Sequence, residues 1–153
     1  MKQFYHVTIA SLWDGDTIEP GRHGKNFRQF RPGGPMPTPE GIASIMWEVA
    51  LESARVATDP LKPSRLNCVF AFETLACARR FKAKHRTDGS ILKIGVANGI
   101  GCHRGDFDII SAGTSAAYVD YMSDGANRYW TAEPTGFVEV LIGGPVRVIE
   151  IVE

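Results

Sequence analysis

Phe4-Tyr5-His6-Val7-Thr8 is a β-prone stretch with a polar histidine at its centre, and it lies almost at the start of the chain. Side chains of a strand alternate between its two faces, so Phe4, His6 and Thr8 share one face. Tyr5, Val7 and Ile9 share the other, more apolar face, which is the expected core face. We therefore expect His6 and Thr8 to face a pocket or solvent, with the rest of the chain built around this strand.

The length of 153 residues favours one domain, residues 1–153. Hydrophobic residues make up 44% of the chain and charged residues 22%, as is typical of a globular protein that can bury a full core. The 17 basic and 17 acidic side chains balance. This balance excludes a globally basic surface for nucleic acid but leaves a local basic patch open.

The three cysteines are an odd number without the spacing of a zinc site, which predicts reduced thiols, no metal and a cytoplasmic protein. No apolar run is long enough to cross a bilayer, and the first residues lack the apolar segment of a signal peptide. We therefore expect no membrane partner.

The clearest helix signal is Thr38-Pro39-Glu40, a capping threonine, a first-turn proline and an acid near the positive helix end. This helix is expected to end near Thr58. Residues 31–39 hold four prolines and two glycines and predict a loop. The predicted core face of the helix consists of Ile42, Ile45, Met46, Val49, Ala50, Val56 and Ala57.

The remaining patterns predict short strands and helices that do not alternate regularly. Residues 137–142 and 146–152 are expected to pair as a hairpin across Gly143-Gly144-Pro145. Residues 14–21 predict a short loop or helical turn and then an extended piece, and Arg22 and His23 are expected in a loop with several glycines. Such an order favours an α+β domain with a mixed or antiparallel sheet over a doubly wound parallel one. The other expected elements are strands at 68–72, 91–96 and 107–110, helices at 74–85 and 115–122, a loop at 98–105 with a polar turn at 103–106, and one more helical turn at 127–131.

Three short motifs, in this order, resemble those of the ADP-ribosyltransferases of the histidine-tyrosine-glutamate branch. Tyr5-His6-Val7-Thr8 is similar to the first-strand motif, Val69-Phe70-Ala71-Phe72 to the second, and Phe137-Val138-Glu139-Val140-Leu141-Ile142 to the third. The resemblance covers most of the chain. It implies an ADP-ribosyltransferase-like fold, with split mixed or antiparallel sheets and flanking helices, and NAD as the substrate.

The resemblance also implies a role for each matching residue. His6 would hydrogen-bond the ribose hydroxyl nearest the adenine, and the backbone at Thr8 would bracket the nicotinamide amide. Phe70 stands where the family usually has tyrosine, so its ring can stack on nicotinamide but supplies no hydroxyl. Glu139 would be the catalytic carboxylate that stabilises the oxocarbenium-like ribose. Arg65 is the candidate for holding a phosphate by paired hydrogen bonds.

Each of these residues also has a simpler interpretation when taken alone. His6 is then a half-exposed strand histidine, Phe70 a core aromatic and Arg65 a solvated or capping arginine. Glu139 lies between two valines, which by alternation favours the surface of the sheet. Only the joint occurrence of the motifs favours a site. Arg22 and His23 are weaker candidates for phosphate binding than Arg65.

The resulting hypothesis is an NAD-dependent enzyme that transfers ADP-ribose to a protein or nucleic-acid acceptor. Two alternatives remain open on the same fold: a non-catalytic nucleotide- or partner-binding module, and an enzyme that removes an RNA 2′-phosphate with NAD. A small α+β protein without a cleft is the fourth. The sequence does not indicate the acceptor, the oligomeric state, or whether residues 31–39 cover the cleft.

Overall fold

Two antiparallel sheets form the centre of the protein, in a computed structural model that describes residues 1–111 and 114–153. The larger sheet has the strand order β1-β4-β7-β2, and the smaller one has the order β3-β6-β5. This confirms the α+β class. The strands are β1 (Lys2–Thr8), β2 (Thr17–Ile18), β3 (Val69–Ala71), β4 (Ser90–Val96), β5 (Cys102–Asp106), β6 (Val138–Ile142) and β7 (Val146–Ile151).

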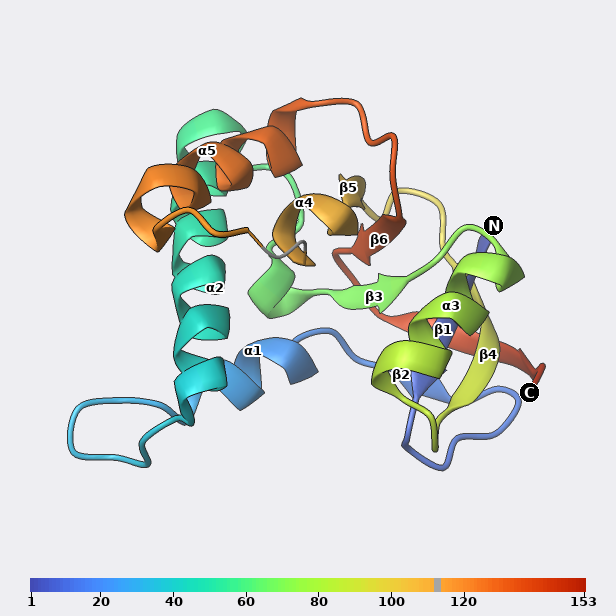
Figure 1. The fold of residues 1–153 in the computed structure, drawn as a ribbon. Helices are drawn as coiled ribbons and strands as arrows, with labels where there is room; N and C mark the ends of the chain where they lie inside the picture. The colour runs from blue at the N-terminus through green and yellow to red at the C-terminus, as the bar shows by residue number, and fades with distance from the viewer. Residues whose placement is uncertain (112–113) are drawn as a thin grey trace.

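Five helices and one 3-10 turn surround the sheets in the described residues. In Figure 1, α2 and α5 lie side by side, whereas α3 lies against β1 and β4 of the larger sheet. No helix of the described residues is long and apolar enough to cross a membrane. The helices are α1 (Arg22–Arg28), α2 (Pro39–Thr58), α3 (Leu75–His85), α4 (Phe107–Ser111) and α5 (Tyr118–Thr131), and the turn is η1 (Arg65–Asn67).

The main core lies between the two sheets, where alternate residues of β3, β4, β6 and β7 meet. The other face of the smaller sheet lies under two different groups of helices. Phe72 and Phe137 pack with α3, whereas Phe70 and Leu141 pack with α2 and α5. Glu139 lies on this face between Phe137 and Leu141, because side chains of β6 alternate. The fold therefore positions Glu139 between the two helix groups.

β1 is an edge strand of the larger sheet and also joins it to the smaller one. Tyr5 and Phe72 exchange two backbone hydrogen bonds of 2.9 and 2.8 Å. As predicted, Tyr5 and Val7 pack into the core beneath α3. Ile9, expected to share that core face, is 54% exposed because it lies beyond the end of the strand. The two sheets are thus joined at Tyr5, the residue before His6.

The predicted helix over residues 39–58 is confirmed as α2, and Thr38 caps it by accepting a hydrogen bond from the Gly41 amide at 3.2 Å. Its predicted core face is wrong in part, since Ala50 packs against the core around Leu51, and Ile45 and Met46 are half-buried. Ile42, Val49 and Val56 are largely exposed, whereas the buried residues are Glu48, Leu51 and Ala54. The helix is turned this way because Glu48 pairs with a buried arginine and Leu51 packs against α5.

Several other sequence predictions are wrong, each for a local reason. β6 and β7 do not form a hairpin, because the Gly143-Gly144-Pro145 link carries the chain from one sheet to the other. Residues 102–106 form a strand instead of a loop with a polar turn, and residues 107–110 belong to a helix instead of a strand. Asp106 accepts a hydrogen bond from the amide of Asp108 in the first turn of that helix, and its other oxygen accepts from the amides of Thr135 and Gly136 before β6. Residues 118–131 form one helix through Gly125, which gives Trp47 room to pack.

A close contact between β5 and α5 can be tested with a single methyl group. An added Cβ at Gly105 would lie 2.2 Å from the Cζ atom of Tyr129, a fully buried ring. We expect Gly105→Ala to lower the free energy of unfolding by about 1–3 kcal/mol, because the ring must move. Gly101→Ala is the matched control, since a Cβ there meets no atom within 4 Å. Equal denaturation midpoints for the two variants would contradict this packing.

Candidate functional site

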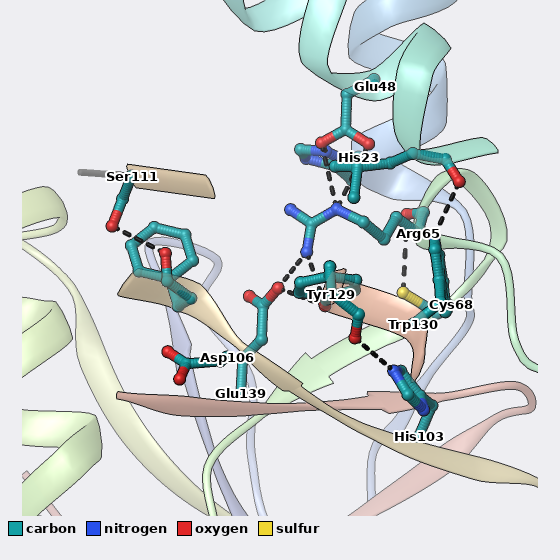
Figure 2. Close-up of polar contacts among 12 residues, drawn as sticks. His23, Glu48, Arg65, Cys68, His103, Asp106, Ser111, Tyr129, Trp130 and Glu139 are labelled. Atoms are coloured by element: carbon teal, nitrogen blue, oxygen red, sulfur yellow. Dashed lines mark hydrogen bonds and ion pairs between the residues drawn. The ribbon is translucent and has the colours of Figure 1, made fainter. Parts of the chain in front are cut away.

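A buried arginine lies between two buried glutamates that come from distant parts of the chain. Arg65 of η1 is 5% exposed, Glu48 of α2 is 7% exposed and Glu139 of β6 is 3% exposed. Arg65 Nε lies 3.2 Å from each carboxylate oxygen of Glu48, and Arg65 Nη1 donates to Glu139 Oε1. Figure 2 shows the guanidinium between the two carboxylates. The three charges are paired where water cannot solvate them.

Tyr129 of α5 adds a hydroxyl to the same cluster. Arg65 Nη1 donates to the Tyr129 hydroxyl at 2.9 Å, and that hydroxyl donates to Glu139 Oε1 at 2.6 Å. Glu139 Oε1 therefore accepts two hydrogen bonds, one from a guanidinium and one from a phenol. Both fix the orientation of the carboxylate.

The ring of Phe70 packs against the Arg65 guanidinium, and His23 contacts both Phe70 and Glu48. The guanidinium carbon of Arg65 lies 4.9 Å from the centre of the Phe70 ring. The His23 ring meets Phe70 edge-on at 4.9 Å, and its Nε2 lies 2.8 Å from Glu48 Oε1. His23 belongs to α1, so the prediction of a loop at this position is wrong. The extended piece predicted within residues 14–21 is confirmed as β2. Buried Gly24 lets α1 approach the backbone of Leu66.

His6 reaches this cluster through the backbone of Phe70. Its Nδ1 lies 2.7 Å from the Phe70 carbonyl oxygen, which can only accept, so Nδ1 carries the proton. Burial lowers the pKa of His6, and the positive charge of Arg22 lowers it further, against the opposing effect of the carbonyl. The neutral imidazole consequently presents Nε2 as an acceptor. Among the described residues, no group is bonded to Nε2, and no direct contact joins His6 to Glu139.

Thr8 lies apart from the cluster, at the far end of β1. It is 6% exposed and its hydroxyl accepts a hydrogen bond from the Ala10 amide at 3.1 Å. It lines a cavity of about 310 Å³, together with residues of the loop after β1 and of the start of β4. The structure therefore does not bring Thr8 together with Phe70 and Glu139.

The paired charges shift one another's proton affinities. Burial alone would lower the pKa of Arg65, but the facing charges of Glu139, Tyr129 and Glu48 raise it well above its ordinary value. Burial would raise the pKa of Glu48, yet Arg65 and His23 hold it below its ordinary value. Burial and the charge of Glu139 raise the pKa of the Tyr129 phenol, so it stays a hydrogen-bond donor.

Two atoms of the cluster keep unused hydrogen-bonding capacity. Within the described residues, Glu139 Oε2 and Arg65 Nη2 have no partner, and no fully buried side-chain nitrogen or oxygen lacks one. In Figure 2 both atoms point to the side on which Ser111 lies, away from the held oxygen Oε1. An acceptor on Glu139 and a donor on Arg65 are thus available to a group outside the described chain.

Some of the site residues predicted from the sequence therefore lie together in the structure, and Thr8 does not. Arg65, Phe70 and Glu139 form one cluster with His6 beside it. The interpretation of Glu139 as a surface acid and of Arg65 as a solvated arginine is wrong, since both are buried. From the sequence, Tyr129-Trp130 is either a cleft-lining pair or, as the favoured interpretation, a packing pair, and Glu48 is not indicated at all. Glu48 shares a helical face with Leu51 and Ala54, and a carboxylate in that register was the available signal.

Residues 1–111 and 114–153 contain no group of three or more histidine, cysteine or acidic side chains arranged to hold a metal ion. Comparison with protein families gives one match, over residues 37–153, to a family described as "Protein of unknown function (DUF2441)". The matched region contains Glu48, Arg65, Phe70, Tyr129 and Glu139 but not His6 or His23. No curated protein matches the chain.

The ion pair between Glu48 and Arg65 predicts a pH-dependent contribution to stability. Because the folded pKa of Glu48 lies below its ordinary value of 4.5, this contribution is complete above pH 4.5 and is lost as pH falls through the lowered value. We expect Glu48→Gln to lower the free energy of unfolding by about 1–3 kcal/mol at pH 7. The loss should shrink below pH 4.5.

Urea denaturation at pH 7 and at pH values below 4.5 measures this difference, with Glu19→Gln as control because Glu19 is exposed and makes no ion pair in the described residues. A loss for Glu48→Gln that is the same at every pH, or absent at pH 7, would contradict the pairing.

Proposed function

The chain belongs to the DUF2441 family, and from the site itself we propose that it is an NAD-dependent ADP-ribosyltransferase. In this proposal the two antiparallel sheets are the split sheets of an ADP-ribosyltransferase-like fold. The enzyme transfers ADP-ribose from NAD to a macromolecular acceptor, a protein or a nucleic acid. The observation that carries the proposal is Glu139, a buried carboxylate with one oxygen held and the other unused.

The position of Glu139 supports a role in chemistry over a role in packing. A purely structural carboxylate would have both oxygens bonded within the protein, as Glu48 has. Glu139 instead has two hydrogen bonds on Oε1 and, among the described residues, none on Oε2. It also lies between the side chains packed under α3 and those packed under α5. A substrate entering between these helix groups would meet Oε2.

The proposed reaction breaks the bond between ribose C1′ and the nicotinamide nitrogen. The electron pair of that bond leaves with nicotinamide, and positive charge develops on the ribose. Glu48 and Glu139 together carry one more negative charge than Arg65 supplies, so the site favours a cation. The acceptor then forms a bond to C1′ and loses its proton. A fixed carboxylate that needs no rearrangement is effective at stabilising such a transition state.

Neighbouring residues have roles that follow from their free atoms. The neutral His6 imidazole would accept a hydrogen bond from a ribose hydroxyl at Nε2, and the half-buried Phe70 ring would stack on nicotinamide. Two of the three guanidinium nitrogens of Arg65, Nε and Nη1, donate hydrogen bonds to the carboxylates of Glu48 and Glu139. We therefore propose that Arg65 mainly positions Glu139, with Nη2 left for a substrate oxygen.

The direct test is Glu139→Gln, which keeps the shape of the side chain and removes its charge. We expect the rate of nicotinamide release from NAD to fall at least about 100-fold, because the developing cation loses its carboxylate. NAD affinity measured by calorimetry should change little. Label transfer from NAD to macromolecules of a cell extract gives a second reading. A wild-type protein that neither binds NAD nor releases nicotinamide would refute the proposal.

The hydroxyl of Tyr129 gives an independent test of how Glu139 is held. Tyr129→Phe removes one of two hydrogen bonds to Oε1 and leaves the ring in place. We expect kcat for nicotinamide release to fall about 10-fold with little change in KM, since the orientation of Oε2 matters mostly in the transition state. Tyr121→Phe, on the same helix but outside the cluster, is the control. Equal kcat values for the two variants would rule out this positioning role.

A non-catalytic nucleotide-binding module is the second candidate function. The observation that favours it is the pair of bonds from Arg65 and Tyr129 to Glu139, together with a phenylalanine where the resembled family usually has tyrosine. Such a module would bind NAD with the same affinity in wild type and Glu139→Gln, and neither protein would release nicotinamide. Nicotinamide release by the wild type alone excludes it.

A further inference from the structure

We propose that α1 and the residues after it form a docking surface for single-stranded nucleic acid, which presents the acceptor to the site. The surface consists of Arg22, Lys25, Arg28 and Arg31, and it is called the α1 basic face below. The proposal that this surface binds nucleic acid does not depend on the proposed function. The proposal that the bound nucleic acid is the acceptor rests on it.

The charge of the α1 basic face is strongly local. The chain as a whole has no net charge, yet no acidic residue occurs between Glu19 and Glu40. All four cations of the α1 basic face are exposed. In the part of the chain that the structure describes, none of them makes an ion pair. A hydrogen bond from Arg55 lowers the pKa of Glu52 and the charge of Arg28 lowers it further, so one acid lies near the face. Neighbouring cations without an ion-paired acid repel one another, which a polyanion would relieve.

The exposed cations of α1 share one side of the helix, and its half-buried aromatic side chains share another. Arg22, Lys25 and Arg28 recur every third residue and so share one side of α1. The opposite side carries His23 and Phe27, both half-buried. All three cations are exposed, although Arg28 Nη1 also donates a hydrogen bond to the Leu66 carbonyl oxygen at 3.5 Å.

The α1 basic face adjoins the candidate site. His23, on the same helix, contacts both Phe70 and Glu48. Arg22 lies near enough to His6 for its charge to lower the pKa of that histidine. A strand of nucleic acid bound along α1 would therefore pass beside the residues that we propose to bind NAD.

The chemistry of the face favours nucleic acid over an acidic protein. Three of its four cations are arginines, whose planar guanidinium matches a phosphate with two hydrogen bonds. Phe30, which follows α1, is half-buried and so offers part of its ring. Regularly placed cations beside an aromatic ring are the combination that binds a single strand, by phosphate contact and base stacking.

The test is binding of a fluorescent single-stranded oligonucleotide, followed by anisotropy at several salt concentrations. The variant reverses three charges: Lys25→Glu, Arg28→Glu and Arg31→Glu. Arg22 is kept because it adjoins His6. We expect the dissociation constant to rise at least about 10-fold, and the slope of log affinity against log salt to flatten by roughly 2, as for three lost phosphate contacts on a single strand.

The control reverses the same number of charges elsewhere, with Lys82→Glu, Lys84→Glu and Arg86→Glu at the end of α3. Denaturation midpoints and nicotinamide release without oligonucleotide check that both variants fold and keep the basal reaction. We expect only the α1 variant to lose oligonucleotide binding and label transfer to the oligonucleotide. Equal losses in the two variants would overturn the proposal.

Two outcomes separate this inference from the proposed function, and a third tests the class of partner. Oligonucleotide binding that depends on α1, without nicotinamide release, supports the surface and refutes the enzyme. Nicotinamide release without oligonucleotide binding supports the enzyme and refutes the surface. Competition by polyglutamate as strong as that by unlabelled oligonucleotide would overturn nucleic acid in favour of an acidic protein partner.

Discussion

The guanidinium of Arg65, held between Glu48 and Glu139, is the interaction on which the rest of the site depends. Three charges leave water together, and such burial is tolerated only when every charge is paired. The pairing joins α2, η1 and β6, and Tyr129 adds α5. It explains why α2 turns Glu48 inward and leaves Ile42 and Val49 exposed. An electrostatic constraint thus decides which face of the longest helix is buried.

The same constraint shapes what the site can do. One guanidinium between two carboxylates leaves an excess of negative charge, and the fixed Oε1 of Glu139 leaves Oε2 with a defined direction. His6 hydrogen-bonds the Phe70 carbonyl oxygen, and the Phe70 ring lies against the guanidinium that holds the carboxylate, so a polar acceptor and an aromatic ring belong to the same cluster. These features suit a substrate that becomes cationic as it reacts, and they are the physical basis of the proposed ADP-ribosyl transfer.

Local signals predicted much of the fold, and long-range partners decided the rest. Thr38-Pro39 and Thr74 mark helix starts because capping acts within a few residues, and both helices are present. Gly143-Gly144-Pro145 fits a hairpin turn and a link between two sheets equally well. Only the pairing partners of β6 and β7 decide between these two structures. The strand at 102–106 has too few apolar residues to be recognised from the sequence. One of its buried positions is Gly105, which makes room for the Tyr129 ring.

The candidate site was predictable only in outline. The order of His6, Phe70 and Glu139 pointed to a cluster, but alternation could not show that Glu139 faces inward, since its flanking valines fit either choice. Its burial depends on Arg65, which is 74 positions away and is indicated by the sequence as a phosphate ligand, not as a partner of Glu139. Tyr129 and Glu48 become visible as functional candidates only once their contacts with that arginine are known.

The most direct test is a crystal structure with an NAD analogue whose bond between ribose and nicotinamide cannot break. The account predicts ribose C1′ in contact with Glu139 Oε2, nicotinamide on the Phe70 ring, and the adenosine ribose hydroxyl at His6 Nε2. An analogue bound elsewhere, with the cluster around Arg65 untouched, would contradict it.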